Sequence, residues 1–285
     1  MTRKSLFYFA LVGLLWGIPY LLMKVAVEDF PPAAVVAGRT LIGASILIPI
    51  AIYRKKFGGA VLGFKYVAFY ALMEMIGPWI LITTAEQKIN SGLAGLLVST
   101  VPIFATIITS LRGDHSVWQF KRILGIVVGF IGLILVVGIE SLSGNSDPLS
   151  IAMVIVASMG YAYAVIMVTS NLPLVDGIAI NGLAMAITTV FWAPVAIAQW
   201  PSSISMNSAL SLIALGIFST ALAFILFFKV MAEIGPARSS LVTYLNTAIA
   251  VVLGVIILRE PLTVGIIVGL PLVLVGSYLA SKKTA

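Results

Sequence analysis

The sequence predicts an all-α membrane protein of about ten transmembrane helices, folded as two inverted five-helix repeats with both termini in the cytoplasm. Three observations predict this fold. The 285 residues are 61% hydrophobic and 9% charged, whereas soluble domains carry roughly a quarter charged residues. The apolar runs are continuous and helix-length, without the alternation of barrel strands. The second half of the chain also repeats the plan of the first about 145 residues later.

The first apolar segment follows Arg3 and Lys4 and has no small-residue cleavage site after it, so we expect a spanning helix and not a signal peptide. Pro31 and Pro32 separate it from the second helix, which a basic cluster follows at residues 54–56. The predicted helices are about Ser5–Val27, Ala33–Tyr53, Phe64–Thr84, Ser91–Leu111, Gln119–Ile139, Leu149–Ser170, Gly177–Gln199, Ala209–Ala232, Ser239–Leu258 and Val264–Ala280.

The most hydrophilic break, residues 140–148, is rich in Ser and Gly. It divides the chain into a first repeat, residues 1–139, and a second repeat, residues 149–285. Because five helices are an odd number, the second repeat enters the membrane inverted relative to the first. Residue pairs at the repeat spacing include Pro49 with Pro194 and Leu81 with Leu226. Inverted repeats are typical of secondary transporters, which hold substrate where the halves meet.

The distribution of charge predicts the orientation, because cytoplasmic loops are enriched in Lys and Arg. With the amino terminus inside, only Lys88 and Arg259 lie outside. The predicted inside cations are Arg3, Lys4, Arg54, Lys55, Lys56, Lys65, Arg112, Lys121, Arg122, Lys229, Arg238, Lys282 and Lys283. The acidic Glu28, Asp29 and Glu86 fall outside. Both termini are therefore expected in the cytoplasm.

Three segments resemble the drug/metabolite transporter superfamily, in its ten-helix EamA-type branch. They are LLWGIPYLLMK with the following PPAAVVAGR, then TALAFILFFKVMAEIGPARSS, then YLNTAIAVVLGVIILREPL. The chain departs from the pattern at Thr247, where the second half commonly has Pro, although Pro102 is present in the first half. The resemblance implies an inner-membrane carrier that exports small metabolites. Among the members, YddG-like exporters of aromatic and other amino acids fit best.

Three charged residues are candidates for binding or coupling. Glu74 is the carboxylate deepest in a predicted helix, and intramembrane ionisable groups are functional candidates by default. It would carry a proton or pair with a substrate ammonium; alternatively, it forms a structural ion pair or a neutral hydrogen-bonded acid. Lys24 and Arg39 would meet a substrate carboxylate, or else snorkel to the interface or pair with nearby acids.

Aromatic and small polar residues recur on helix faces that we expect to meet around a substrate, since such pockets suit amphipathic ligands. On the first helix, Trp16 and Tyr20 share a face with Lys24. The alternative is ordinary helix packing. The predicted binding-site residues are Trp16, Tyr20, Glu74, Pro78, Trp79, Ser99, Tyr163, Met167, Thr220, Phe224, Phe227, Tyr244 and Thr247.

Prolines and glycines inside the spans predict local geometry. Pro19, Pro78 and Pro102 should kink their helices. The spacing of Gly125 with Gly129, and of Gly265 with Gly269, permits close helix contact. Because the fifth and tenth helices otherwise lack polar residues, we place them at the periphery.

The sequence lacks the residues that metal binding, ATP hydrolysis and thiol chemistry require. The sequence contains no cysteine and no P-loop, and its single His115 has no second ligand at metal spacing. We therefore expect no metal, cofactor or nucleic-acid partner and no enzymatic activity. The expected partners are a small-molecule substrate and the lipid bilayer, with a monomer sufficient.

The leading hypothesis is an inner-membrane exporter of amino acids that works by alternating access through an aromatic-lined cavity. The alternatives are an exporter of lipophilic or quaternary cations and, more distantly, a membrane enzyme or a non-transporting membrane protein.

Overall fold

The computed structural model describes residues 3–113, 119–142, 147–234, 239 and 241–281, and these residues form helices and no strand. Among them, seven helical segments are long and apolar enough to cross a membrane. Val242–Ile256 and Val264–Leu279 are shorter apolar helices. The predicted all-α membrane fold is confirmed. The predictions for His115, Arg238, Lys282 and Lys283 lie outside the described residues.

The helices follow the predicted spans within a few residues. They are α1 (Arg3–Ala26), α2 (Pro32–Tyr53), α3 (Phe57–Leu62), α4 (Phe64–Ala71), α5 (Gly77–Ala85), α6 (Ser91–Val98), α7 (Val101–Leu111), α8 (Phe120–Leu142), α9 (Pro148–Asn171), α10 (Gly177–Ala198), α11 (Met206–Ala214), α12 (Ala223–Ile234), α14 (Val242–Ile256) and α15 (Val264–Ser281). Two π-helical segments, η1 (Leu72–Ile76) and η3 (Leu215–Leu222), join α4 to α5 and α11 to α12.

Three predicted spans are interrupted, for reasons visible in the sequence. Pro78 lies at the start of α5 directly after η1, and Pro102 lies at the start of α7 after the break between α6 and α7. Proline lacks the backbone N–H that would continue the preceding helix, so the chain leaves regular α geometry just before it. The third interruption, η3, contains no proline and was not predicted.

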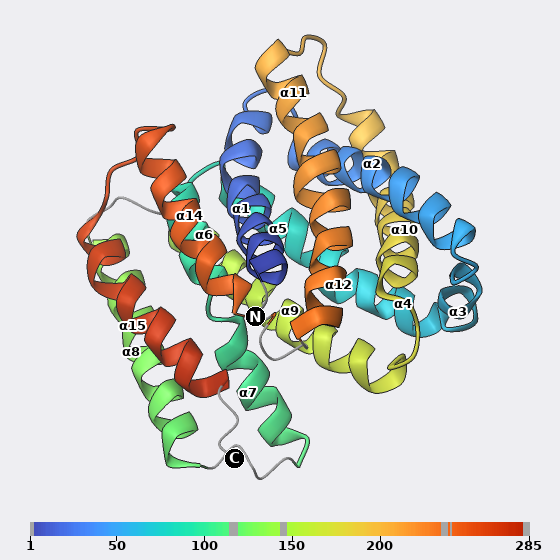
Figure 1. The fold of residues 1–285 in the computed structure, drawn as a ribbon. Helices are drawn as coiled ribbons and strands as arrows, with labels where there is room; N and C mark the ends of the chain where they lie inside the picture. Colours follow the sequence, from blue (N-terminus) through green and yellow to red (C-terminus); the bar gives the residue numbers. More distant parts are fainter. Residues whose placement is uncertain (1–2, 114–118, 143–146, 235–238, 240, 282–285) are drawn as a thin grey trace.

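Helices that correspond in the two halves pack against each other. α2 begins at Pro32 and α10 begins 145 residues later at Gly177, and these two helices pair along their length. α8 and α15 pair in the same way and lie side by side at one edge of the molecule (Figure 1). The π-helical segments also occur at corresponding positions. The division at residues 140–148 stays a prediction, since residues 143–146 lie outside the described part of the chain.

Close backbone contact holds α8 against α15, as the glycine spacing predicts. A Cβ at Gly276 of α15 would overlap backbone atoms of Gly129 and crowd the carbonyl of Gly125 on α8. Gly269 lies against Val136 and the carbonyl of Gly132. Small residues on both faces let the two backbones approach closely.

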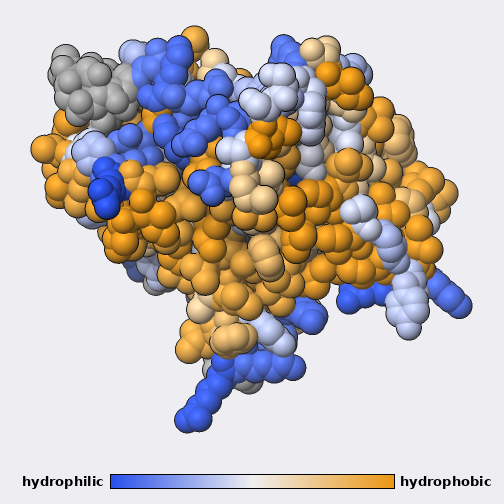
Figure 2. Space-filling model, turned by 90° about the horizontal axis from the view of Figure 1, so that it is seen from above, coloured by the Kyte–Doolittle hydropathy of each residue, from blue (hydrophilic) through white to orange (hydrophobic). Residues whose placement is uncertain are grey.

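The outer surface carries a broad hydrophobic band, with hydrophilic residues gathered at two opposite edges of the molecule (Figure 2). Large apolar side chains from several helices are exposed, among them Leu62, Phe120, Val190, Ile197 and Ile256. Exposed apolar area of this extent does not occur on soluble monomers and is what a lipid-facing surface requires.

The loops that the sequence places outside meet at one end of the bundle, which we call the linked end. There Ser205 N–H donates to Asp29 Oδ2 at 2.9 Å, and Lys88 pairs with Asp147 at 3.8 Å. At the opposite end, the Ser5 hydroxyl donates to Glu233 Oε2 at 2.6 Å. The alternation of loops therefore agrees with the predicted topology. Which end faces the cytoplasm stays a prediction.

Candidate functional site

A buried cation lies near the middle of the bundle. Arg39 of α2 is 6% exposed, and its Nε and Nη2 donate to Thr220 Oγ1 of η3 at 3.3 and 3.1 Å. Nη1 donates to Met23 Sδ of α1 at 3.7 Å. Among the described residues, no carboxylate forms an ion pair with this guanidinium. A buried charge without a counterion is costly, so such a group is poised to accept an anion.

Aromatic residues surround the guanidinium. Its Cζ lies 3.8 Å from the ring centroid of Trp79 on α5, a cation–π contact. Tyr20 of α1 and Tyr161 of α9 lie within electrostatic range of Arg39, and the Tyr161 hydroxyl interacts with the Trp79 indole. The structure thus brings four predicted residues, Arg39, Tyr20, Trp79 and Thr220, together from four different elements.

Glu74 is a second buried group near Tyr161, since the two lie within electrostatic range of each other. It belongs to η1, and its Oε2 is buried with no hydrogen-bond partner among the described residues. Tyr161 and Tyr70 are both within electrostatic range of the carboxylate. Tyr70 is held in place by donating to Asn181 Oδ1 at 3.1 Å. π-helical turns are frequent at functional sites because the extra residue reorients neighbouring side chains. A cationic group and an acidic group therefore both lie within electrostatic range of Tyr161.

Trp16 of α1 contacts Phe224 and Phe227 of α12, three residues predicted to line a substrate cavity. The Trp16 ring centroid lies 5.6 Å from that of Phe224, edge to face, and 4.6 Å from that of Phe227. Phe228 extends the group, with its centroid 5.8 Å from Phe227. Rings at these separations attract one another and present a large apolar surface.

The remaining predicted residues lie elsewhere. Lys24 donates from Nζ to the carbonyls of Glu86 and Ile89 at 2.6 and 2.8 Å, at the linked end. Met167 and Pro78 are buried between helices. Ser99 donates to the Leu96 carbonyl, and Thr247 donates to carbonyls of its own helix and of Gly95.

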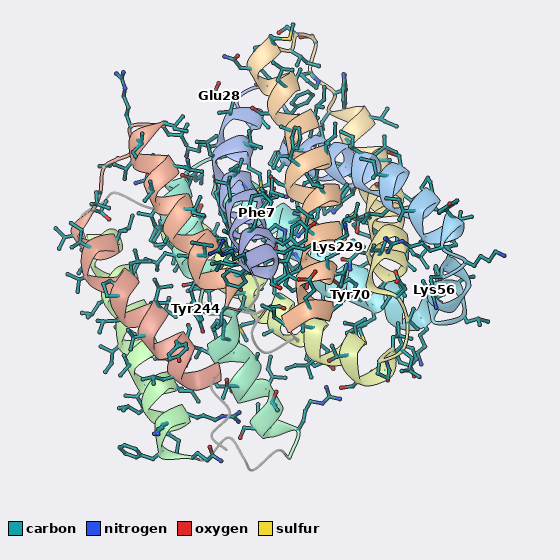
Figure 3. The ribbon with its side chains drawn as sticks, viewed as in Figure 1. Phe7, Glu28, Lys56, Tyr70, Lys229 and Tyr244 are labelled. Carbon is teal, nitrogen blue, oxygen red and sulfur yellow. The ribbon has the colours of Figure 1, made fainter. Side chains whose placement is uncertain are left out.

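Two predicted tyrosines lie away from Arg39. Tyr163 is 37% exposed and packs on Phe69, where the chain faces outward. Tyr244 of α14 packs on Tyr278 of α15, and Figure 3 places it on the α15 side of the bundle, while Tyr70 lies on the α4 side.

Sequence reasoning missed Tyr161, Asn181 and Met23. Tyr161 is two positions before the chosen Tyr163 and so projects from nearly the opposite face of α9. Its own face carries the small Ala157 and Ser158, both fully buried. That stripe of small residues marks the packed face of the helix and was the signal available.

Glu86 differs from its expected setting. The sequence places it in a polar outside loop, yet its side chain is 0% exposed and neither carboxylate oxygen has a hydrogen-bond partner among the described residues. The loop that follows α5 folds under the end of α1, where Lys24 holds its carbonyls. Loop position alone therefore did not reveal its burial.

A family model now decides what kind of protein this arrangement belongs to. The model of the EamA-like transporter family matches residues 3–138 and again residues 148–282. The chain belongs to the EamA-like transporter family. It is an integral membrane protein and a transporter, and the predicted resemblance to the drug/metabolite transporter superfamily is confirmed.

EamA-family relatives match along nearly the whole chain. The uncharacterized transporter YoaV of Bacillus subtilis is 27% identical over 277 residues, covering 94% of this chain and 93% of YoaV. The uncharacterized inner membrane transporter YedA of Escherichia coli is 26% identical over 281 residues, covering 95% of this chain and 90% of YedA. A solved crystal structure covers 98% of both chains with a TM-score of 0.66 at 16% identity, which supports the shared fold.

Proposed function

We propose that this EamA-family transporter carries α-amino acids, aromatic and other small amphipathic ones, and exports them across a bacterial inner membrane by alternating access. The observation that supports the proposal is that buried Arg39 and Glu74 both lie within electrostatic range of Tyr161. An unpaired buried guanidinium and an unpartnered buried carboxylate oxygen match the two charges of a zwitterion. The resemblance to YddG-like exporters favours this role, and the relative YedA is named an inner membrane transporter, which agrees with this location.

Each part of an amino acid has a complementary group. Arg39 presents a planar fork of donors suited to a carboxylate, and Trp79 stacking fixes the plane of that fork. Glu74 Oε2 would accept from the ammonium group. The ring group of Trp16, Phe224 and Phe227 offers apolar surface for a side chain. Because both groups are buried, a zwitterion would give each of them a partner of opposite charge and so offset two desolvation costs at once.

Lipophilic cations are a less suitable substrate class for this site. A cation exporter would need Glu74, Trp16 and Trp79 to form an anionic, aromatic cage. However, the Trp79 ring carries the Arg39 guanidinium, and Trp16 packs on Phe224 and Phe227. A quaternary cation at Glu74 would also face the positive charge of Arg39 across Tyr161.

The proposal is tested by uptake of labelled phenylalanine, threonine and tetramethylammonium into proteoliposomes of the purified full-length chain, with and without a proton gradient. We expect saturable uptake of phenylalanine and no uptake of the quaternary cation. Uptake of the cation alone would overturn the proposal. Amino-acid uptake without a gradient would indicate facilitated transport, and uptake only with a gradient would indicate proton coupling.

Replacing Glu74 tests the ammonium site. We expect Glu74→Gln to lower the affinity for phenylalanine by about tenfold to 100-fold, because the neutral amide loses a charge-assisted hydrogen bond. The measurement is isothermal titration of the purified variant. Glu28→Gln, which removes an exposed carboxylate in the loop between α1 and α2, should bind as the unmodified chain does. An unchanged affinity in Glu74→Gln would remove Glu74 from the site.

A further inference from the structure

A second buried acid lies apart from the proposed substrate site, at the linked end. Glu86 follows α5, and its fully buried side chain has two oxygens without a hydrogen-bond partner among the described residues. Burying an ionised carboxylate without a donor is strongly unfavourable. The group is therefore either neutral in this conformation or a source of strain in it.

Glu260 joins the two halves of the chain beside Glu86. Lying between α14 and α15, it accepts from Ser91 N–H at 2.9 Å, from the Ser91 hydroxyl at 2.7 Å and from Gly92 N–H at 3.4 Å. It thereby caps α6, where the unpaired N–H groups of the helix favour a negative charge. Gly254 makes room for this cap, since a Cβ there would overlap Glu260 Oε2. We call this contact the α6 latch.

The charged groups around Glu86 have opposite effects on the ionisation of its carboxyl group. Lys24 on α1 favours its ionised form, and Glu260 opposes it. Tyr20 on α1 lies within electrostatic range, and Lys88 on the same loop is 63% exposed and pairs with Asp147 instead. Burial is the largest effect and, with Glu260, raises the pKa of Glu86 well above its usual value in spite of Lys24.

We infer that Glu86 is a proton-binding site that controls the α6 latch: protonated, it lets the linked end stay closed, and ionised, it drives that end open. In the closed state Glu86 lies within electrostatic range of Glu260, so a negative charge on Glu86 repels Glu260. Opening lets water reach Glu86 and removes the repulsion. This inference depends on the chain being a transporter and not on the identity of its substrate.

The pH dependence has a definite sign. The pKa of Glu86 is raised in the closed state relative to a water-exposed carboxyl. Closure is therefore fully stable below the ordinary carboxyl pKa, about 4.3. It weakens as pH rises from there through the raised value, because the open state releases the proton at a lower pH than the closed state does. Tyr20, within range of both Glu86 and Arg39, connects this device to the proposed substrate site.

Cysteine labelling measures the opening directly, since the natural chain has no cysteine. Val251 on α14 is buried against Gly92 of α6, so Val251→Cys should react with N-ethylmaleimide only when the latch opens. Rates in the purified full-length protein are divided at each pH by those of Ser203→Cys in an exposed loop, which removes the pH dependence of the thiolate itself. The normalised rate should rise about tenfold per pH unit across the window, as release of one proton requires.

Second substitutions in the Val251→Cys background decide the assignment. Glu86→Gln should make the normalised profile flat. Glu260→Gln should move the midpoint to lower pH, and Lys24→Gln should move it to higher pH, because the two neighbours act on Glu86 in opposite directions. These two variants keep Glu86 and test the inference even where Glu86→Gln does not fold. A pH response that survives in Glu86→Gln, or is lost instead in Glu74→Gln, would overturn it, as would unmoved midpoints.

Discussion

Arg39→Gln is expected to weaken phenylalanine binding by about 30- to 150-fold, the equivalent of about 2–3 kcal/mol for losing charge-assisted hydrogen bonds. Glutamine can still donate to Thr220 Oγ1, so the local packing survives while the positive charge is lost. Arg39→Lys should also bind poorly, because an ammonium group neither forms a planar fork nor stacks on Trp79. Isothermal titration of the purified variants measures both effects.

Lys88→Gln is the matched control for Arg39→Gln. It removes a cation that is 63% exposed at the linked end, and we expect its affinity for phenylalanine to be unchanged. Thermal unfolding in detergent should show that each Arg39 variant is folded. If Arg39→Gln binds phenylalanine as tightly as the natural chain, the guanidinium has a structural role and the carboxylate site lies elsewhere.

Gly276→Ala is expected to destabilise the protein by about 1–3 kcal/mol, the usual cost of overpacking a tight contact. The added methyl group would meet backbone atoms of Gly129 and Gly125, which cannot turn aside as a side chain can. α8 and α15 must then separate along their length. The melting temperature of the full-length chain in detergent measures this effect.

Gly58→Ala is the control for Gly276→Ala. It shows whether replacing a helical glycine by alanine lowers stability where no close contact is present. Gly58 lies in the exposed α3, and a Cβ there meets no atom within 4 Å. Because alanine favours helix by about 1 kcal/mol over glycine, this variant should melt at the same or a higher temperature. Equal losses in Gly276→Ala and Gly58→Ala would contradict the close packing of α8 on α15.

The fold was largely predictable from the sequence, because hydrocarbon thickness fixes the length of each apolar run and prolines mark where helices break. Pro78 and Pro102 stand at two of the interruptions. The η3 segment has no such marker. It packs against α2, and its extra residue per turn means that a regular helical wheel misjudges which side chains face inward.

Several residues of the candidate site could be chosen from the sequence, but the way they come together in space could not. Arg39 and Thr220 are 181 positions apart and meet only because α2 packs on η3. Helix α9 is apolar all round and carries tyrosines on two of its faces. The composition alone does not show which of these two faces is turned toward lipid. Tyr163 was chosen, while Tyr161 lies between Arg39 and Glu74. Glu86 was predicted to be exposed to water because loop residues usually are. Only the tertiary fold shows that its side chain is buried.

The most direct test of the central claim compares three ligands that differ by one charged group each. Phenylalanine, phenethylamine and 3-phenylpropanoate are titrated into the purified full-length protein. We predict that phenylalanine binds about 30-fold or more tightly than either analogue, because each analogue leaves one buried charge, Arg39 or Glu74, without its partner. Equal affinity for all three would show that the protein recognises the aromatic ring alone and would contradict a site built for a zwitterion.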